Sequence, residues 1–228
     1  MKISRIRSQI LVLPQQDPLA NTPEDTSAAR PIVIVRLDTD DGIEGIGVTF
    51  YGGAITASLK RAVGDLGALT IGEDPLRVEA IVDKLRTAAG GSGPAGMFTL
   101  ALAAIDIALW DIRGKALNQP LWKLLGGARQ RVPTYASGAL RRNLPLDEVV
   151  AAAGRLKDKG FREMKTQLAL PGETSPVKEV ERMRRVREAI GPDIKLMCDI
   201  NQRWGSSRRS TSAAGSRTPG SASSGSKT

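Results

Sequence analysis

Residues 161–201 read FREMKTQLALPGETSPVKEVERMRRVREAIGPDIKLMCDIN, and this stretch decides the fold class. The pattern predicts a strand over Phe161 to Leu168, a helix over Pro176 to Ile190 and a strand over Ile194 to Asn201. Two strands joined through a helix in this way lie parallel, with a right-handed crossover. The order is typical of a doubly wound sheet or of a β/α barrel, and alternation alone does not distinguish these two folds.

The same alternation begins earlier in the chain. Val132 to Ser137 is short and apolar and predicts another strand, and Leu146 to Lys159 predicts a helix that ends at Gly160. Asp147 and Glu148 fall in the first turn of this helix, where they favour its positive dipole end. Residues 131–204 are therefore predicted to form three consecutive strand-helix units of a parallel fold.

The preceding part of the chain, residues 1–130, has a different pattern of predicted secondary structure. Ile3 to Leu13 and Pro31 to Leu37 predict antiparallel strands, and the polar stretch from Pro14 to Arg30 between them predicts a loop. Met97 to Leu117 predicts a helix that is apolar nearly all round, which is typical of a helix at the centre of a domain core. The glycine-rich stretch from Ala89 to Gly96 lacks the context of a phosphate-binding loop and predicts a connector.

The composition is that of a globular protein, with 41% hydrophobic residues in a chain of 228 and a formal net charge of +9. Basic residues of the body alternate with acids, as in Val177 to Glu188, and this pattern is typical of a solvated helix face. We therefore expect no nucleic-acid partner. No apolar run of about 18 residues and no signal pattern occur, so we expect no membrane partner and a cytoplasmic location. The single cysteine, Cys198, is predicted to be a small core residue.

Polar side chains stand near the ends of the two strands quoted first. Lys165 and Gln167 share one side of the earlier strand, and Asp199 and Asn201 share one side of the later strand. Working residues of parallel folds lie at the carboxyl ends of the strands, so these four converge if the strands are neighbours. A lysine, amides and a carboxylate suit Mg²⁺ and an anionic oxygen substrate. A structural ion pair between lysine and aspartate is the alternative interpretation.

Two longer motifs resemble a known family. Residues 104–127 read AIDIALWDIRGKALNQPLWKLLGG and residues 132–138 read VPTYASG, and both are similar to the mandelate racemase/muconate lactonizing enzyme family of the enolase superfamily. The resemblance extends over nearly all of residues 1–204. It implies an α+β N-terminal capping domain over residues 1–130, followed over residues 131–204 by the first three βα units of an incomplete β/α barrel.

The resemblance also implies roles for residues. Asp199 corresponds to the first of three carboxylate ligands to Mg²⁺, and Lys165 to the first lysine of a Lys-x-Lys motif whose second position is Gln167 here. The capping loops correspond to Pro14 to Arg30 and Phe50 to Gly53, so Phe50 and Tyr51 are expected to contact the substrate, as is Asn201.

The activity that follows from the resemblance is abstraction of the proton α to a carboxylate, with a lysine or histidine base and Mg²⁺. The expected substrate is a small carboxylate, an acid sugar or a 2-hydroxy acid, and the intact enzyme is expected to be a homo-oligomer. A neutral amide at Gln167 cannot accept the proton as a second base, which favours a one-base dehydratase over a two-base racemase.

The tail from Gly205 to Thr228 contains no Val, Ile, Leu, Met or aromatic residue, and this composition predicts disorder. Back-translation with permitted codons of our choice, read one base back, gives LEQAIDIGRRVEDAGLGLFWLED, which has the pattern of the next helix and strand of a barrel. We therefore expect a frameshift after Trp204, a truncated and inactive chain, and an incomplete Mg²⁺ site. A natural Ser-rich linker, and a noncatalytic capping or dimerisation module, are the alternatives.

Overall fold

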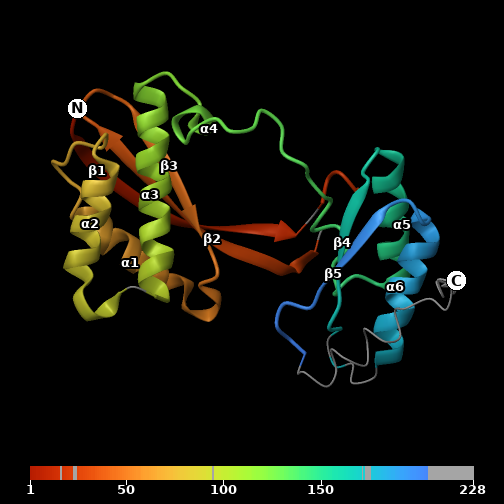
Figure 1. Cartoon of the computed structure of the whole chain (residues 1–228). Helices are drawn as coiled ribbons and strands as arrows, with labels where there is room; N and C mark the ends of the chain where they lie inside the picture. The colour runs from red at the N-terminus through yellow and green to blue at the C-terminus, as the bar shows by residue number, and fades with distance from the viewer. Residues whose placement is uncertain (16, 23–24, 94, 171, 173–175, 205–228) are drawn as a thin grey trace, which may run out of the picture. The chain divides into compact units, whose positions relative to one another are not determined.

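The computed structural model describes residues 1–15, 17–22, 25–93, 95–170, 172 and 176–204. The chain divides into two units (Figure 1). The first unit comprises Met1–Gln15 and Asp25–Arg131, and the second comprises Gln16–Glu24 and Val132–Thr228. The tail after Trp204, for which we predicted disorder and a frameshift, lies outside the described residues. None of the helices in these described ranges is long and apolar enough to cross a membrane.

The first unit contains a three-stranded antiparallel sheet in the order β1 (Ile3–Gln15), β2 (Asp25–Thr39) and β3 (Glu44–Thr49). The turn between β2 and β3 is closed by Thr39, whose backbone N–H donates to the carbonyl oxygen of Ile43 over 2.9 Å. Alternate residues of β2 are fully buried, and they are Val33, Val35 and Leu37. One face of the sheet therefore contributes directly to the core.

Three helices supply the rest of this core, and they are α1 (Thr56–Ala68), α2 (Val78–Ala89) and α3 (Met97–Ala116). The short α4 (Leu121–Leu124) has no buried residue, and single 3-10 turns lie at Gly53–Ile55 and Gly90–Ser92. The helix α3 matches its predicted bounds to within one residue at the C-terminal end. Its buried residues lie within the core cluster of the first unit, and they include Ala101, Ala104, Ile105, Ala108, Leu109 and Ile112. The prediction of a central core helix is confirmed.

Two glycines of β3 allow the strand to lie directly on the backbone of α3. A Cβ atom added at Gly47 would lie 1.8 Å from the carbonyl oxygen of Ala104, and one added at Gly45 would lie 2.3 Å from that of Ala108. Neither position has room for any side chain. The backbone N–H of Ile46 donates over 2.9 Å to the carboxylate of Asp111, which ties β3 to α3 a second time.

The loop predicted from Pro14 to Arg30 is much shorter in the structure. Pairing of β1 with β2 continues past the point where β3 ends. The last residue of β3, Thr49, is opposite Val33 of β2. Beyond that point β1 still pairs with β2, with Leu13 opposite Arg30 and Gln15 opposite Asp25. We call this extension, Leu11–Gln15 with Asp25–Ile32, the two-stranded ribbon. A polar composition misled the prediction, because an antiparallel pair needs no apolar side chains to complete its hydrogen bonds.

The second unit contains α5 (Leu146–Asp158), β4 (Glu163–Gln167), α6 (Pro176–Ile190) and β5 (Lys195–Asp199). The strands β4 and β5 pair in parallel, with Lys165 opposite Met197 and Gln167 opposite Asp199. Met164 packs with buried residues of both helices, which include Val149, Ala152, Leu156, Val186 and Ile190. The two helices therefore cover one face of this sheet, as Figure 1 shows.

The first of the three predicted barrel strands is nearly absent. Within Val132 to Ser137 only Ala136 forms a bridge, parallel to Met164, and its neighbours are exposed. Pro133 has no N–H to contribute to a ladder, which accounts for part of this loss. The described part of the second unit therefore has two strands and a single bridge in place of three strands.

One further expectation about the second unit is wrong, and another is correct only in part. Cys198 is exposed, although it lies on the same face of the sheet as the buried Thr166, with which it is paired. Helical periodicity predicts an apolar stripe on α6 that consists of Val177, Val180, Met183, Val186 and Ile190. Of these, Val186 and Ile190 are buried as predicted, but Val177 is 70% exposed and the other buried residues are Glu179 and Arg182. Periodicity missed the two charged residues because it took apolar residues as its only guide.

Candidate functional site

The carboxyl ends of β4 and β5 bring the polar residues predicted from the sequence together. Lys165 and Gln167 lie on the face opposite Met164, because side chains alternate along a strand. Nζ of Lys165 lies 3.1 Å from Oδ2 of Asp199, and both side chains are partly buried. The backbone register places Gln167 beside Asp199. We call this end of the sheet the carboxyl edge.

Both oxygens of the Asp199 carboxylate have protein partners. Oδ1 accepts the backbone N–H of Asn201 over 2.9 Å, and Oδ2 faces Lys165. The hydrogen bond from the Asn201 backbone, aided by Lys165, holds the pKa of the Asp199 carboxyl below its ordinary value. Asp199 is therefore an anion with no proton to give at neutral pH.

Lys165 is held as a cation in this arrangement. Its hydrogen bond to Asp199 raises the pKa of the Lys165 amine, against an opposing effect of burial. Its ammonium also lies 5.4 Å from the centre of the Tyr135 ring, where the negative face of the aromatic ring attracts it. While Asp199 remains its partner, Lys165 stabilises negative charge and does not accept a proton.

A third segment reaches this edge through Arg142, which sequence reasoning missed. Its Nη2 atom donates to the side-chain oxygen of Asn201 and, over 3.4 Å, to the backbone carbonyl of Asp199. Its backbone N–H lies 3.5 Å from Oε1 of Gln167. Burial, and then the charge of Arg203, lower the pKa of the Arg142 guanidinium. Arg142 therefore links the ends of β4 and β5.

Two buried charged residues of α6, Glu179 and Arg182, bind the backbone of segments near the carboxyl edge. The carboxylate of Glu179 accepts the backbone N–H groups of Ala169, over 3.1 Å, and Leu170, over 2.8 Å. Nη2 of Arg182 donates to the carbonyls of Arg141, over 2.6 Å, and Leu144, over 3.1 Å. These contacts fix the segments that follow β4 and the Ala136 bridge. The sequence gives one signal for these contacts. Glu179 and Arg182 lie next to the helical face that periodicity places toward the core.

The carboxyl edge offers few free oxygen ligands for Mg²⁺. Asp199 offers a carboxylate and Asn201 an amide oxygen, and both already bind protein groups. Within the residues that the structure covers, no group of three or more His, Cys, Asp or Glu side chains could hold a metal ion. Mg²⁺ in proteins takes several oxygen ligands in near-octahedral geometry. The described residues therefore do not make a Mg²⁺ site by themselves.

Phe50 and Tyr51, predicted to contact the substrate, belong to the first unit. Their ring centres lie 4.4 Å apart with the planes tilted by 43°. Both are exposed, by 43% and 77%, and Tyr51 has a positive φ of 71°. A non-glycine residue rarely adopts this conformation, so the loop presents its two aromatic rings at a cost in backbone strain.

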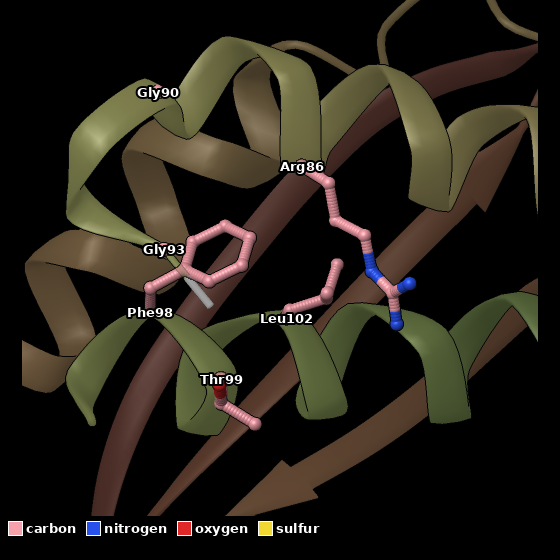
Figure 2. Close-up of a pocket in the computed structure, with 6 residues that line it drawn as sticks. All are labelled: Arg86, Gly90, Gly93, Phe98, Thr99 and Leu102. Carbon is pink, nitrogen blue, oxygen red and sulfur yellow. The ribbon is translucent and has the colours of Figure 1, made fainter. Parts of the chain in front are cut away.

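The first unit also has a cavity of about 370 Å³ beside the connector between α2 and α3. Figure 2 shows its lining, which consists of Arg86, Gly90, Gly93, Phe98, Thr99 and Leu102. None of the predicted site residues takes part in it. The glycine-rich stretch supplies backbone to this lining through Gly90 and Gly93.

Comparison with known proteins identifies the family. Residues 8–126 match the N-terminal domain of the mandelate racemase / muconate lactonizing enzyme family, and residues 148–216 match the enolase C-terminal domain-like family. The chain therefore belongs to the mandelate racemase/muconate lactonizing enzyme family of the enolase superfamily, as its motifs predicted.

Two curated relatives are similar to most of this chain. The chain is 32% identical to 3,6-anhydro-alpha-L-galactonate cycloisomerase of Streptomyces coelicolor over 205 residues, covering 89% of this chain and 55% of the relative. It is 31% identical to L-talarate/galactarate dehydratase of Salmonella typhimurium over 212 residues, covering 89% and 52%. The chain thus spans about half the length of the curated relatives it matches.

A solved structure confirms the shared fold. A mutant of L-talarate/galactarate dehydratase liganded with Mg and L-glucarate superposes with a TM-score of 0.76 at 28% identity, covering 90% of this chain and 52% of that chain. The mixed α/β fold with a small N-terminal sheet is therefore that of enolase-superfamily enzymes.

Proposed function

We propose that this chain is part of a Mg²⁺-dependent enzyme that abstracts the proton α to the carboxylate of an acid sugar and eliminates water. The observation that carries the proposal is the pairing of Lys165 with Asp199 at the carboxyl edge, 3.1 Å apart. The edge is where parallel folds place their working residues. A relative that acts on acid sugars and a neighbour that holds Mg and L-glucarate support this assignment.

In this proposal Asp199 is one ligand of the metal, and its engagement there would release Lys165. A lysine without its carboxylate partner loses the main cause of its raised pKa, and the neutral amine can then accept the substrate proton. In this proposal residues 1–130 are a capping domain and residue 131 begins a β/α barrel, and Phe50, Tyr51 and Asn201 would contact the substrate.

Gln167 decides between reaction types in the proposal. It lies beside Asp199 in the sheet and its carbonyl oxygen faces the backbone of Arg142. An amide donates and accepts hydrogen bonds but has no basic nitrogen. The second base of a racemase is therefore missing at this position, which favours elimination of water.

We propose further that the chain of 228 residues is inactive. It contains no histidine, it has no acidic residue after Asp199, and its described residues supply one carboxylate to the carboxyl edge. A developing negative charge on the substrate needs concentrated positive charge, which a metal held by one carboxylate does not supply.

The test is to shift the reading frame of the gene after the Trp204 codon, so that the frame beginning LEQAIDIGRRVEDAGLGLFWLED is read on into the downstream sequence, and to assay the product. The restored protein is expected to dehydrate an acid sugar only with Mg²⁺, and Lys165→Ala and Asp199→Asn should each remove most of this activity. Full activity in chelator, or rapid racemisation that depends on Gln167, would show that the assigned chemistry is wrong.

A further inference from the structure

Arg142 is buried at the carboxyl edge with part of its guanidinium unused. The residue is 8% exposed, and its Nη1 atom is buried without a hydrogen-bond partner among the residues that the structure describes. A buried donor without a partner destabilises the protein, and more so when it is charged. The position therefore favours any ligand group that would complete the guanidinium.

The partner that Arg142 does have is a weak one for its charge. Nη2 donates to the amide oxygen of Asn201, which is neutral and belongs to an exposed residue. A carboxylate would bind both terminal nitrogens of the guanidinium at once, through two charge-assisted hydrogen bonds. A carboxylate arriving from solvent beside Asn201 can therefore replace the amide and satisfy Nη1 in the same step.

The surrounding charge favours an anion at this point. Burial, and then the charge of the exposed Arg203, lower the pKa of Arg142, while the carboxylates of Asp199 and Glu179 act in the opposite direction. Glu179 is itself engaged by the backbone N–H groups of Ala169 and Leu170. Asp199 accepts hydrogen bonds from Lys165 and from the Asn201 backbone, so its carboxylate oxygens are occupied. The positive potential near Arg142 is thus left for a group that the ligand brings.

We infer that Arg142 binds a second carboxylate of the substrate, remote from the carbon that loses its proton, and that the enzyme prefers sugar diacids to sugar monoacids. The inference rests on the proposed function, because it concerns the distal end of the same substrate. Arg142 then determines specificity and takes no part in proton transfer.

The test compares galactarate with galactonate, which differ in one terminal group, a carboxylate or a hydroxymethyl. Binding to the full chain is measured by ligand-observed NMR titration. We expect galactarate to bind about tenfold more tightly, as one charge-assisted contact predicts. Arg142→Gln should abolish most of this preference and leave galactonate unchanged. Arg142→Lys keeps the positive charge but cannot bind a carboxylate through two nitrogens, so it should retain only part of the preference for galactarate.

Arg203→Gln is the matched control, since it removes one positive charge from the same region without removing the guanidinium that is buried. It should weaken both acids slightly and keep their ratio. Equal binding of the two acids, a ratio that survives in Arg142→Gln, or no binding of either acid would each overturn the inference. A folding defect in Arg142→Gln would appear as loss of galactonate binding, and Arg142→Lys would then decide.

Different results would contradict the proposed function and the proposed role of Arg142. If the frame-restored protein dehydrates galactonate and ignores galactarate, the proposed function stands and the role of Arg142 is wrong. If it dehydrates neither acid, nor any other acid sugar, while the chain still prefers galactarate through Arg142, the diacid site stands and the proposed reaction is wrong.

Discussion

The ammonium of Lys165 lies 3.1 Å from Oδ2 of Asp199, in the position where a cation would bind this carboxylate. We therefore predict that Mg²⁺ or Mn²⁺ binds the chain weakly. Lys165→Met should increase the affinity, because it frees one carboxylate oxygen, and Asp199→Asn should abolish binding. Titration with Mn²⁺ followed by electron paramagnetic resonance measures all three proteins. Tight binding by the unmodified chain would contradict this account.

Glu179→Ala should destabilise the second unit by about 3 kcal/mol, because the buried backbone N–H of Ala169 and the partly buried N–H of Leu170 lose a charged acceptor. Urea denaturation monitored at Trp204 measures the effect, since this buried residue packs near Leu168 and Ala169. Trp110 and Trp122 are replaced by Phe in both proteins so that the signal is specific. Glu181→Ala, which removes an exposed ion pair with Arg184, should cost far less stability because solvent screens exposed pairs.

Gly47→Ala should cost about 3 kcal/mol or prevent folding of the first unit, because the added methyl group would overlap the Ala104 carbonyl. The matched control is Gly64→Ala within α1, where the nearest atom to the new methyl is 4.0 Å away. That substitution should stabilise the unit by roughly 0.5–1 kcal/mol through helix propensity. Thermal denaturation compares the two, and equal effects would refute the packing argument.

Asp106→Asn should raise the melting temperature at pH 7. Burial, and then the charge of Glu79, raise the pKa of the Asp106 carboxyl above its ordinary value of 3.8. The folded state thus holds the proton more tightly than the unfolded chain, and the free energy of unfolding falls as pH rises from 3.8 toward the raised pKa. The gain from Asn should shrink as pH is lowered toward 3.8. Asp83→Asn, an exposed change on α2, is the control, and an equal gain there would contradict a specific cost at Asp106.

The 228-residue chain should not exchange the α-proton of galactarate or galactonate with deuterium in the presence of Mg²⁺. Exchange is a more sensitive readout than product formation, because it detects proton abstraction without elimination. Proton NMR over a day gives the measurement. Exchange that disappears in Lys165→Ala would show that the chain is active and that our account of the carboxyl edge is incomplete.

Much of the fold could be predicted because local pattern and tertiary structure agree. The helix α6 has the predicted bounds, Pro176–Ile190, since Gly191 and Pro192 stop it wherever it packs. The meeting of Lys165 with Asp199 followed from strand order and alternation alone. These features depend on the chain's own periodicity and on one rule of connection.

The remaining features depend on partners that a linear pattern does not identify. Arg142 lies 59 residues from Asn201, so their contact has no local signal. Glu179 is buried because backbone N–H groups of another segment need an acceptor there. Val132 to Ser137 has a strand's composition, yet only Ala136 pairs, because forming a ladder depends on its neighbours more than on propensity.

The two-stranded ribbon has a consequence for how β1 and β2 open. From Val33 onward β2 pairs with both β1 and β3 and buries side chains in the core, whereas its residues before Val33 pair with Leu11 to Gln15 of β1 alone among the described strands. An isolated pair of strands is marginally stable in water. Amide hydrogen exchange should therefore differ along a single strand, slow before Ile10 and fast beyond Leu11, so that one continuous hairpin contains two independent units of local unfolding.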